Sequence, residues 1–156
     1  MSLTLYAHPF SSYCQKVLIA LYENATPFAY RAFGEDDPAA AAEWERLWPL
    51  KRMPVLVDGG RTVLESSTII EHLDLHYPGA LRLIPSDRDD AIEVRMMDRI
   101  FDNYVMTPMQ TFTFDRLRPE ESRDPYGVQQ ARDMLDTAYA WLDGRLAGRE
   151  WATGGA

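Results

Sequence analysis

The chain has 156 residues, of which 46% are hydrophobic and 26% are charged, an ordinary composition for a globular protein. Its formal net charge of −8 argues against binding to nucleic acid or to an anionic membrane surface, because both rely on clustered lysine and arginine. The single cysteine forbids an internal disulfide bond, and the three histidines form no zinc motif, so we expect no metal. The longest apolar run is too short to cross a bilayer, and we expect a cytoplasmic protein.

A strand followed by a helix is predicted at the start of the chain. Residues 3–6 alternate as a strand does, and residues 17–24 continue as a helix. A helix that begins between them directs its unpaired N–H groups and its positive dipole end toward Ser11, where they favour a carboxylate, phosphate or thiolate. Ser11 and Cys14 have the spacing of a C-x-x-C redox pair, with a hydroxyl in place of the first thiol.

Five further elements are expected before residue 79, in the order strand, helix, strand, strand, helix, at residues 28–32, 39–48, 55–58, 61–64 and 66–77. Residues 34–38 are predicted to form a loop, and the helix at 39–48 carries Trp44, Leu47 and Trp48 on one side at helical spacing. The pair Gly59 and Gly60 predicts a hairpin between the last two strands. Ser66 or Ser67 is the expected N-cap of the last of these helices.

The second half of the chain predicts helices only. A linker is followed by a long helix that runs to about Leu117, with a bend or break near Thr107 because of Pro108. The next helix starts after Asp124 and Pro125, and its apolar residues recur every three or four positions. These residues are Val128, Ala131, Leu135, Ala138, Leu142 and Leu146.

Three motifs in order carry a family resemblance. Residues 11–16, S-S-Y-C-Q-K, resemble the active-site turn of glutaredoxins with the first cysteine exchanged for serine, as in serine-type glutathione S-transferases. Residues 52–56 are similar to the family's K-[VI]-P-V-L loop, which contains a cis-proline, here Pro54. Residues 63–73 are similar to its L-x-E-S-x-x-I corner. The resemblance is close over the first half of the chain and looser beyond it.

The resemblance implies an α/β thioredoxin-like domain over residues 1–79, a linker at 80–87 and an all-α domain over 88–156. The order β-α-β-α-β-β-α predicted from the sequence is the order that such an α/β domain has. Family members continue with further helices, so the all-α domain is expected to be incomplete. They are also typically homodimers, and we expect the face that bears Met96, Met97, Ile100 and Phe101 to take part in one.

The implied activity is conjugation of the glutathione thiolate to an electrophilic, mainly apolar small molecule, as in detoxification. Ser11 would donate its hydroxyl hydrogen to the sulfur, although a serine at this position can also serve only as a helix cap. Cys14 is interpreted as a small buried residue rather than a reactive thiol. Tyr6, inside the first strand, ranks second as the activating hydroxyl.

The resemblance also implies which residues hold glutathione. The backbone of Met53 and Val55 would pair with the peptide, as an added strand does. Glu65 would bind the γ-glutamyl ammonium, and Ser66 with the helix N-terminus would bind its carboxylate. Arg52 would meet the glycine carboxylate, although an exposed arginine is usually only solvated.

A pocket for the second substrate is assigned to the cluster of aromatic and methionine side chains that includes Tyr104, Met109 and Phe112, although such a helix face is more often core. Two alternative functions remain open. A glutaredoxin-like thiol oxidoreductase would use Cys14, and Ser11 stands where its attacking thiol belongs. A non-catalytic binding protein on the same fold is the other, because a fold does not determine an activity.

Overall fold

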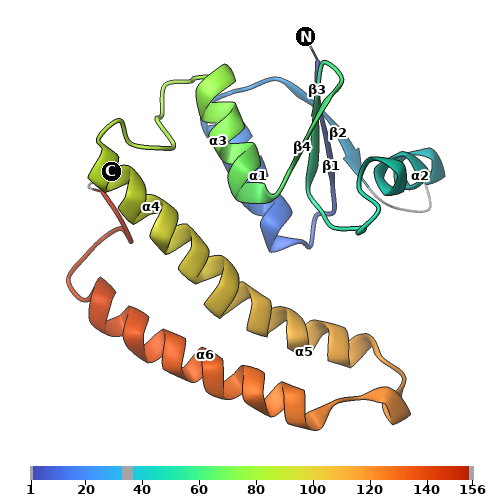
Figure 1. Cartoon of the computed structure of the whole chain (residues 1–156), viewed down its shortest axis with the longest axis vertical. Helices are drawn as coiled ribbons and strands as arrows, with labels where there is room; N and C mark the ends of the chain where they lie inside the picture. Colours follow the sequence, from blue (N-terminus) through green and yellow to red (C-terminus); the bar gives the residue numbers. More distant parts are fainter. Residues whose placement is uncertain (1, 33–36, 155–156) are drawn as a thin grey trace. The chain divides into compact units, whose positions relative to one another are not determined.

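A four-stranded mixed sheet with three helices forms the first part of the chain (Figure 1). The computed structural model describes residues 2–32 and 37–154, and it divides into two compact units, Met1–Ile84 and Pro85–Ala156. The strands are β1 (Leu3–Ala7), β2 (Phe28–Ala32), β3 (Val55–Asp58) and β4 (Arg61–Leu64). The helices are α1 (Ser12–Glu23), α2 (Pro38–Leu47) and α3 (Ser66–His76).

The sheet order is β2-β1-β3-β4, with β1 parallel to β2 and antiparallel to β3. This is the predicted thioredoxin-like α/β fold, and the predicted order of elements is confirmed. The hairpin is confirmed too, because Gly59 and Gly60 both adopt positive φ angles, +53° and +96°, between β3 and β4. The predicted loop at residues 34–38 lies largely outside the described residues.

The two faces of the sheet are covered by different helices. Helices α1 and α3 cover one face, and α2 covers the other (Figure 1). Because side chains alternate along a strand, Leu5 and Ala7 of β1 pack under α1 and α3, whereas Tyr6 packs with Ala40 and Val55 on the α2 side. The apolar side of α2, predicted from Trp44, Leu47 and Trp48, packs against that second cluster.

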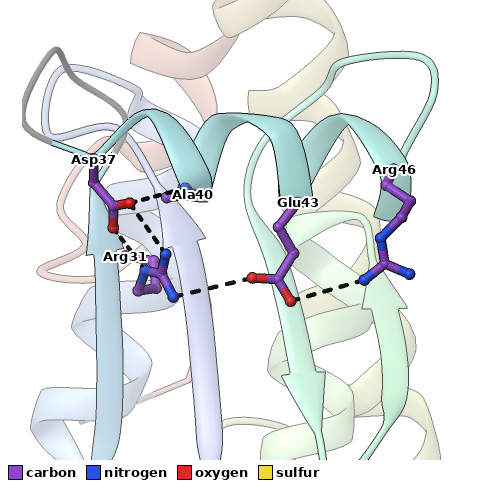
Figure 2. A network of polar contacts seen from close by, with 5 residues as sticks. All are labelled: Arg31, Asp37, Ala40, Glu43 and Arg46. Atoms are coloured by element: carbon purple, nitrogen blue, oxygen red, sulfur yellow. Dashed lines mark hydrogen bonds and ion pairs between the residues drawn. The ribbon is translucent and has the colours of Figure 1, made fainter.

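A polar network fixes α2 beside β2 (Figure 2). Asp37 caps α2 by accepting a hydrogen bond from the Ala40 N–H at 2.9 Å, and Arg31 of β2 binds both Asp37 carboxylate oxygens, at 2.9 and 3.2 Å. The bound guanidinium holds the pKa of the Asp37 carboxyl below its usual value. Glu43 extends the network through two ion pairs. Its Oε2 lies 4.0 Å from Nη1 of Arg31, and its Oε1 lies 3.9 Å from Nη2 of Arg46.

The hairpin is tied to α3 by Asp58. Its carboxylate accepts a hydrogen bond from the Tyr77 hydroxyl at 2.6 Å and lies 3.0 Å from Nε2 of His72. Both contacts lower the pKa of Asp58. Asp58 therefore links the end of β3 to the C-terminal end of α3.

The second unit is helical. It contains α4 (Arg88–Ile100), a π-helical segment η1 (Phe101–Met106), α5 (Thr107–Leu117), a short 3₁₀ turn η2 (Glu120–Ser122) and α6 (Pro125–Leu146). Helices α5 and α6 pack together, and Ala131, Leu135 and Leu142 on the predicted face of α6 are buried.

In place of the bend or break expected near Thr107, the structure has the π-helical segment η1. The Thr107 N–H and hydroxyl both donate to the carbonyl of Asp102, five residues back, so the helix continues without interruption. Pro108 lies in the first turn of α5.

Candidate active site

Three segments that carry predicted site residues leave the sheet at the same end. In the strand register Tyr6 lies opposite Val55, and Val55 lies opposite Leu64. The turn after β1, the loop before β3 and the corner after β4 therefore begin side by side in the first unit. They carry Ser11, Met53 and Glu65, respectively.

Ser11 is the N-cap of α1. Its backbone is extended, with φ −87° and ψ 118°, and its Oγ accepts a hydrogen bond from the Cys14 N–H at 3.4 Å. Two hydrogen bonds fix the turn before it. The Ser11 N–H donates to the His8 carbonyl at 3.1 Å, and the Gln15 side-chain amide donates to the Pro9 carbonyl at 2.7 Å. The capping bond uses a lone pair of Oγ, so the hydroxyl hydrogen can still be donated to an anion. The capping and activating roles of Ser11 are thus compatible.

Cys14, in the first turn of α1, has its side chain in the core and is fully buried. Burial raises the pKa of its thiol, and the hydrogen bond with Ser11 offsets this only in part. A buried thiol held neutral is poorly suited to nucleophilic exchange.

Tyr6 lies on the opposite face of the sheet, among the side chains under α2. Burial, with a hydrogen bond to Glu43, raises the pKa of its hydroxyl to about 12. The guanidinium of Arg31 lies 5.8 Å from the centre of its ring. The same strand alternation that directs Leu5 and Ala7 toward α1 thus directs Tyr6 away from it.

The loop before β3 contains a cis peptide bond between Met53 and Pro54, as the resemblance implied. Met53 is half-buried and packs against the core, and Arg52 is exposed. Val55 lies inside the sheet with its side chain buried, so only its backbone is available to a ligand.

The corner after β4 places Glu65, not Ser66 or Ser67, at the N-cap position of α3. Glu65 is exposed and adopts a positive φ of +66°, which is costly for a residue other than glycine. The predicted serine cap was therefore wrong, because both serines already lie inside the helix. The side chain of Glu65 makes no capping hydrogen bond to the first turn of α3. Its N–H groups therefore point toward the corner, next to the buried Ser66.

Lys16 connects the two helices at this end of the sheet. Its Nζ donates a hydrogen bond at 3.2 Å to Oγ of Ser67, which lies in the first turn of α3. Sequence reasoning missed this residue. The only signal was a cation in a largely apolar helix, since Lys16 is followed directly by residues 17–22.

The three residues assigned to the second-substrate pocket all lie in the second unit. Tyr104 borders a hollow with Ile92 and Met96, whereas Phe112 borders another. The sulfur of Met109 is 3.9 Å from the hydroxyl of Tyr139.

Residues 2–32 and 37–154 contain no cluster of His, Cys, Asp and Glu that would hold a metal ion. None of their helices has both the length and the hydropathy needed to cross a lipid bilayer.

Comparison with known proteins matches residues 5–81 to the family "Glutathione S-transferase, N-terminal domain". A glutathione S-transferase of Methylobacterium radiotolerans, solved with glutathione sulfonate, is 30% identical with a TM-score of 0.83, and the alignment covers 100% of this chain and 72% of that one. One from Methylobacillus flagellatus, solved with bound glutathione, is 25% identical with a TM-score of 0.87, over 97% and 73% of the two chains.

A probable maleylacetoacetate isomerase of Vibrio cholerae is 39% identical over 103 residues, which are 62% of this chain and 46% of the relative. The chain thus spans about half the length of that curated relative. With the fold, the family match and the 30% identical structure in agreement, the chain belongs to the glutathione S-transferase family.

Proposed function

We propose that this chain binds glutathione and conjugates its thiolate to an electrophilic, mainly apolar small molecule. The observation that carries the proposal is the Ser11 hydroxyl, which caps α1 at the same end of the sheet as the open N-terminus of α3. A thiolate next to Ser11 and a carboxylate at α3 would each meet the positive end of a helix.

Ser11 acts by favouring the ionised thiol. A free thiol of this type has a pKa of about 8.5, so only a small fraction is nucleophilic at neutral pH. A hydrogen bond from Ser11 Oγ and the field of α1 stabilise the thiolate and lower that pKa. The sulfur lone pair then forms the bond to the electrophilic carbon, and the displaced group leaves with its electron pair.

The remaining predicted residues hold the peptide. Glu65, exposed at the corner, would bind the γ-glutamyl ammonium, and the first turn of α3 with Ser66 would bind its carboxylate. The backbone of Met53 and Val55 would bind the central residue, and Arg52 the glycine carboxylate. The Methylobacillus flagellatus relative was solved with bound glutathione, which supports the proposal that glutathione is the ligand of this chain.

The relatives' names support a second candidate activity, a glutathione-dependent isomerisation. The 39% identical relative is named for maleylacetoacetate, a conjugated enedione to which a thiolate can add and from which it can leave after bond rotation. The same activated thiolate would serve both reactions. The glutaredoxin-like alternative is disfavoured by the burial of Cys14.

Turnover assays with glutathione separate these activities. We expect conjugation of an aryl halide, measured as loss of free thiol. Isomerisation of a cis-enedione without net loss of thiol would indicate the second candidate, and reduction of a mixed disulfide the glutaredoxin-like one. Binding of glutathione by calorimetry without turnover of any substrate in the panel would contradict the enzymatic proposal.

We also propose that the protein is a cytoplasmic homodimer. The predicted apolar face needs one correction, because Met97 is buried within the chain. Ile92, Met96 and Tyr104 instead expose an apolar stripe along α4 and η1. Sedimentation at micromolar concentration should show a dimer, and Met96→Lys should shift it to a monomer; a wild-type monomer would contradict the proposal.

A further inference from the structure

The loop between α2 and β3 lies back on the last turns of α2. The indole Nε1 of Trp44 donates to the carbonyl oxygen of Arg52 at 2.8 Å. The Lys51 N–H donates to the Trp48 carbonyl at 2.8 Å, and Lys51 Nζ lies 2.9 Å from Oε1 of Glu45. Two residues of α2 and its C-cap residue, Trp48, therefore contact two consecutive residues of the loop.

This loop holds a conformation that its own sequence does not favour. Lys51 has a positive φ of +53°, a left-handed conformation that glycine adopts readily and lysine rarely. Such a conformation persists only when surrounding contacts fix it. The contacts that fix Lys51 are its backbone bond to Trp48 and its ion pair with Glu45, both at the end of α2.

Trp44 is the residue that joins the loop to the core. Its ring packs against the cluster of Tyr6, Ala40 and Val55, and its N–H reaches the Arg52 carbonyl. The indole thus fixes the peptide group between Arg52 and Met53 relative to β3. A phenylalanine would keep the packing and lose the hydrogen bond.

We propose that Trp44 is a positioning residue for the peptide ligand: its indole N–H holds the Arg52–Met53 segment in the conformation that binds glutathione. The inference rests on the proposed function, since Arg52 and Met53 are assigned to glutathione there. It goes beyond that function by assigning a role to a side chain that does not touch the ligand.

The test compares Trp44→Phe with Trp48→Phe. Both tryptophans are half-buried and pack against the same cluster, but the hydrogen bond from an indole N–H to the loop is made by Trp44. We expect Trp44→Phe to raise the Kd and KM for glutathione about three- to tenfold, the effect of one lost hydrogen bond. At saturating glutathione, kcat and the pH profile should stay within twofold of wild type, because Ser11 is untouched. Trp48→Phe should change neither constant.

Hydrogen exchange of the Lys51 amide provides a measurement that needs no ligand. This amide is bonded to the Trp48 carbonyl, so its protection reports the order of the loop. We expect faster exchange in Trp44→Phe than in Trp48→Phe, with both variants unfolding cooperatively. Equal exchange in the two variants would overturn the inference, as would an unchanged KM or a loss confined to kcat. If wild type binds no glutathione, the proposed function fails, and exchange alone decides whether Trp44 orders the loop.

Discussion

Helices α1 and α3 begin at the same end of the sheet, yet their first turns are built differently. The first turn of α1 is closed by a side chain, because Oγ of Ser11 accepts the Cys14 N–H. That of α3 follows a left-handed Glu65 whose side chain makes no such bond. The serine that caps α1 keeps its hydroxyl hydrogen to donate, which suits a thiolate. The uncapped start of α3 offers backbone N–H groups, which suit a carboxylate.

The largest effect is expected where the capped helix meets sulfur. Ser11→Ala should lower the conjugation rate about ten- to a thousandfold, the scale for one lost donor to an anion, with glutathione affinity nearly unchanged. The pKa of bound glutathione should rise toward that of the free thiol, so that alkali partly restores the rate. Rates measured between pH 6 and 9 check this.

Ser12→Ala is the matched control for Ser11, since it alters the adjacent serine, which begins α1. Its rate and pH profile should match those of wild type. If Ser11→Ala also conjugates at the wild-type rate with an unshifted profile, Ser11 is only a cap, and the backbone of α1 would have to activate the thiol.

The open helix end should govern affinity instead. Glu65→Gln removes a charged partner of the γ-glutamyl ammonium, and should weaken glutathione binding about tenfold or more. Calorimetry with glutathione acetylated on its α-amino group supplies the control, because wild type and variant should then bind equally weakly. An equal loss of affinity for both ligands would mean that Glu65 does not bind the ammonium.

Asp58 sharpens the comparison at the far end of α3. Asp58→Asn should lower the free energy of unfolding by about 1–2 kcal/mol at pH 7, since Asp58 bonds Tyr77 and contacts His72. The folded pKa of Asp58 is lowered, so its stabilisation is full above the carboxyl's ordinary pKa of about 4 and is lost as the pH falls further. Urea unfolding at several pH values should show the two proteins converging in acid. A constant difference down to pH 2 would show that the charge of Asp58 is not involved.

Much of the first unit could be predicted because its signals are local. Strand alternation, the Gly59-Gly60 turn and the apolar side of α2 each follow from neighbouring residues, and the structure confirms them. The backbone of Glu65 could not be predicted in this way. A serine at a helix start normally predicts a cap, and nothing local to residue 65 indicates a positive φ.

Contacts that depend on tertiary structure were missed for the same reason. The bond from Trp44 to the Arg52 carbonyl and that from Lys16 to Ser67 join separate elements. In the second unit, the π-helical segment that contains Tyr104 changes the number of residues per turn. Helical spacing at about 3.6 residues per turn therefore does not describe this part of the chain, and the assignment of Tyr104 and Phe112 to a second-substrate pocket stays a prediction.

The cost of the positive φ at Glu65 can be separated from the role of its carboxylate. Glu65→Gly and Glu65→Ala both remove the side chain, but only glycine adopts this backbone without strain. We expect the glycine variant to be about 1 kcal/mol more stable than the alanine variant by thermal unfolding, with equally weakened glutathione binding. Equal stability of the two variants would show that residue 65 is not strained.

The smallest effect on rate is expected at Cys14, the thiol beneath the capped turn. The bond that caps α1 is donated to Ser11 by the backbone N–H of Cys14, so Cys14→Ala keeps the cap and should leave conjugation within a few-fold of wild type. Burial raises the pKa of the thiol, so iodoacetamide should alkylate the native protein much more slowly than a free thiol at pH 7. Ser11→Cys is the complementary variant, because it rebuilds a C-x-x-C pair at the start of α1 and should weaken conjugation while creating disulfide exchange with glutathione. Rapid alkylation of native wild type, or loss of conjugation in Cys14→Ala, would instead make Cys14 the reactive group at this turn.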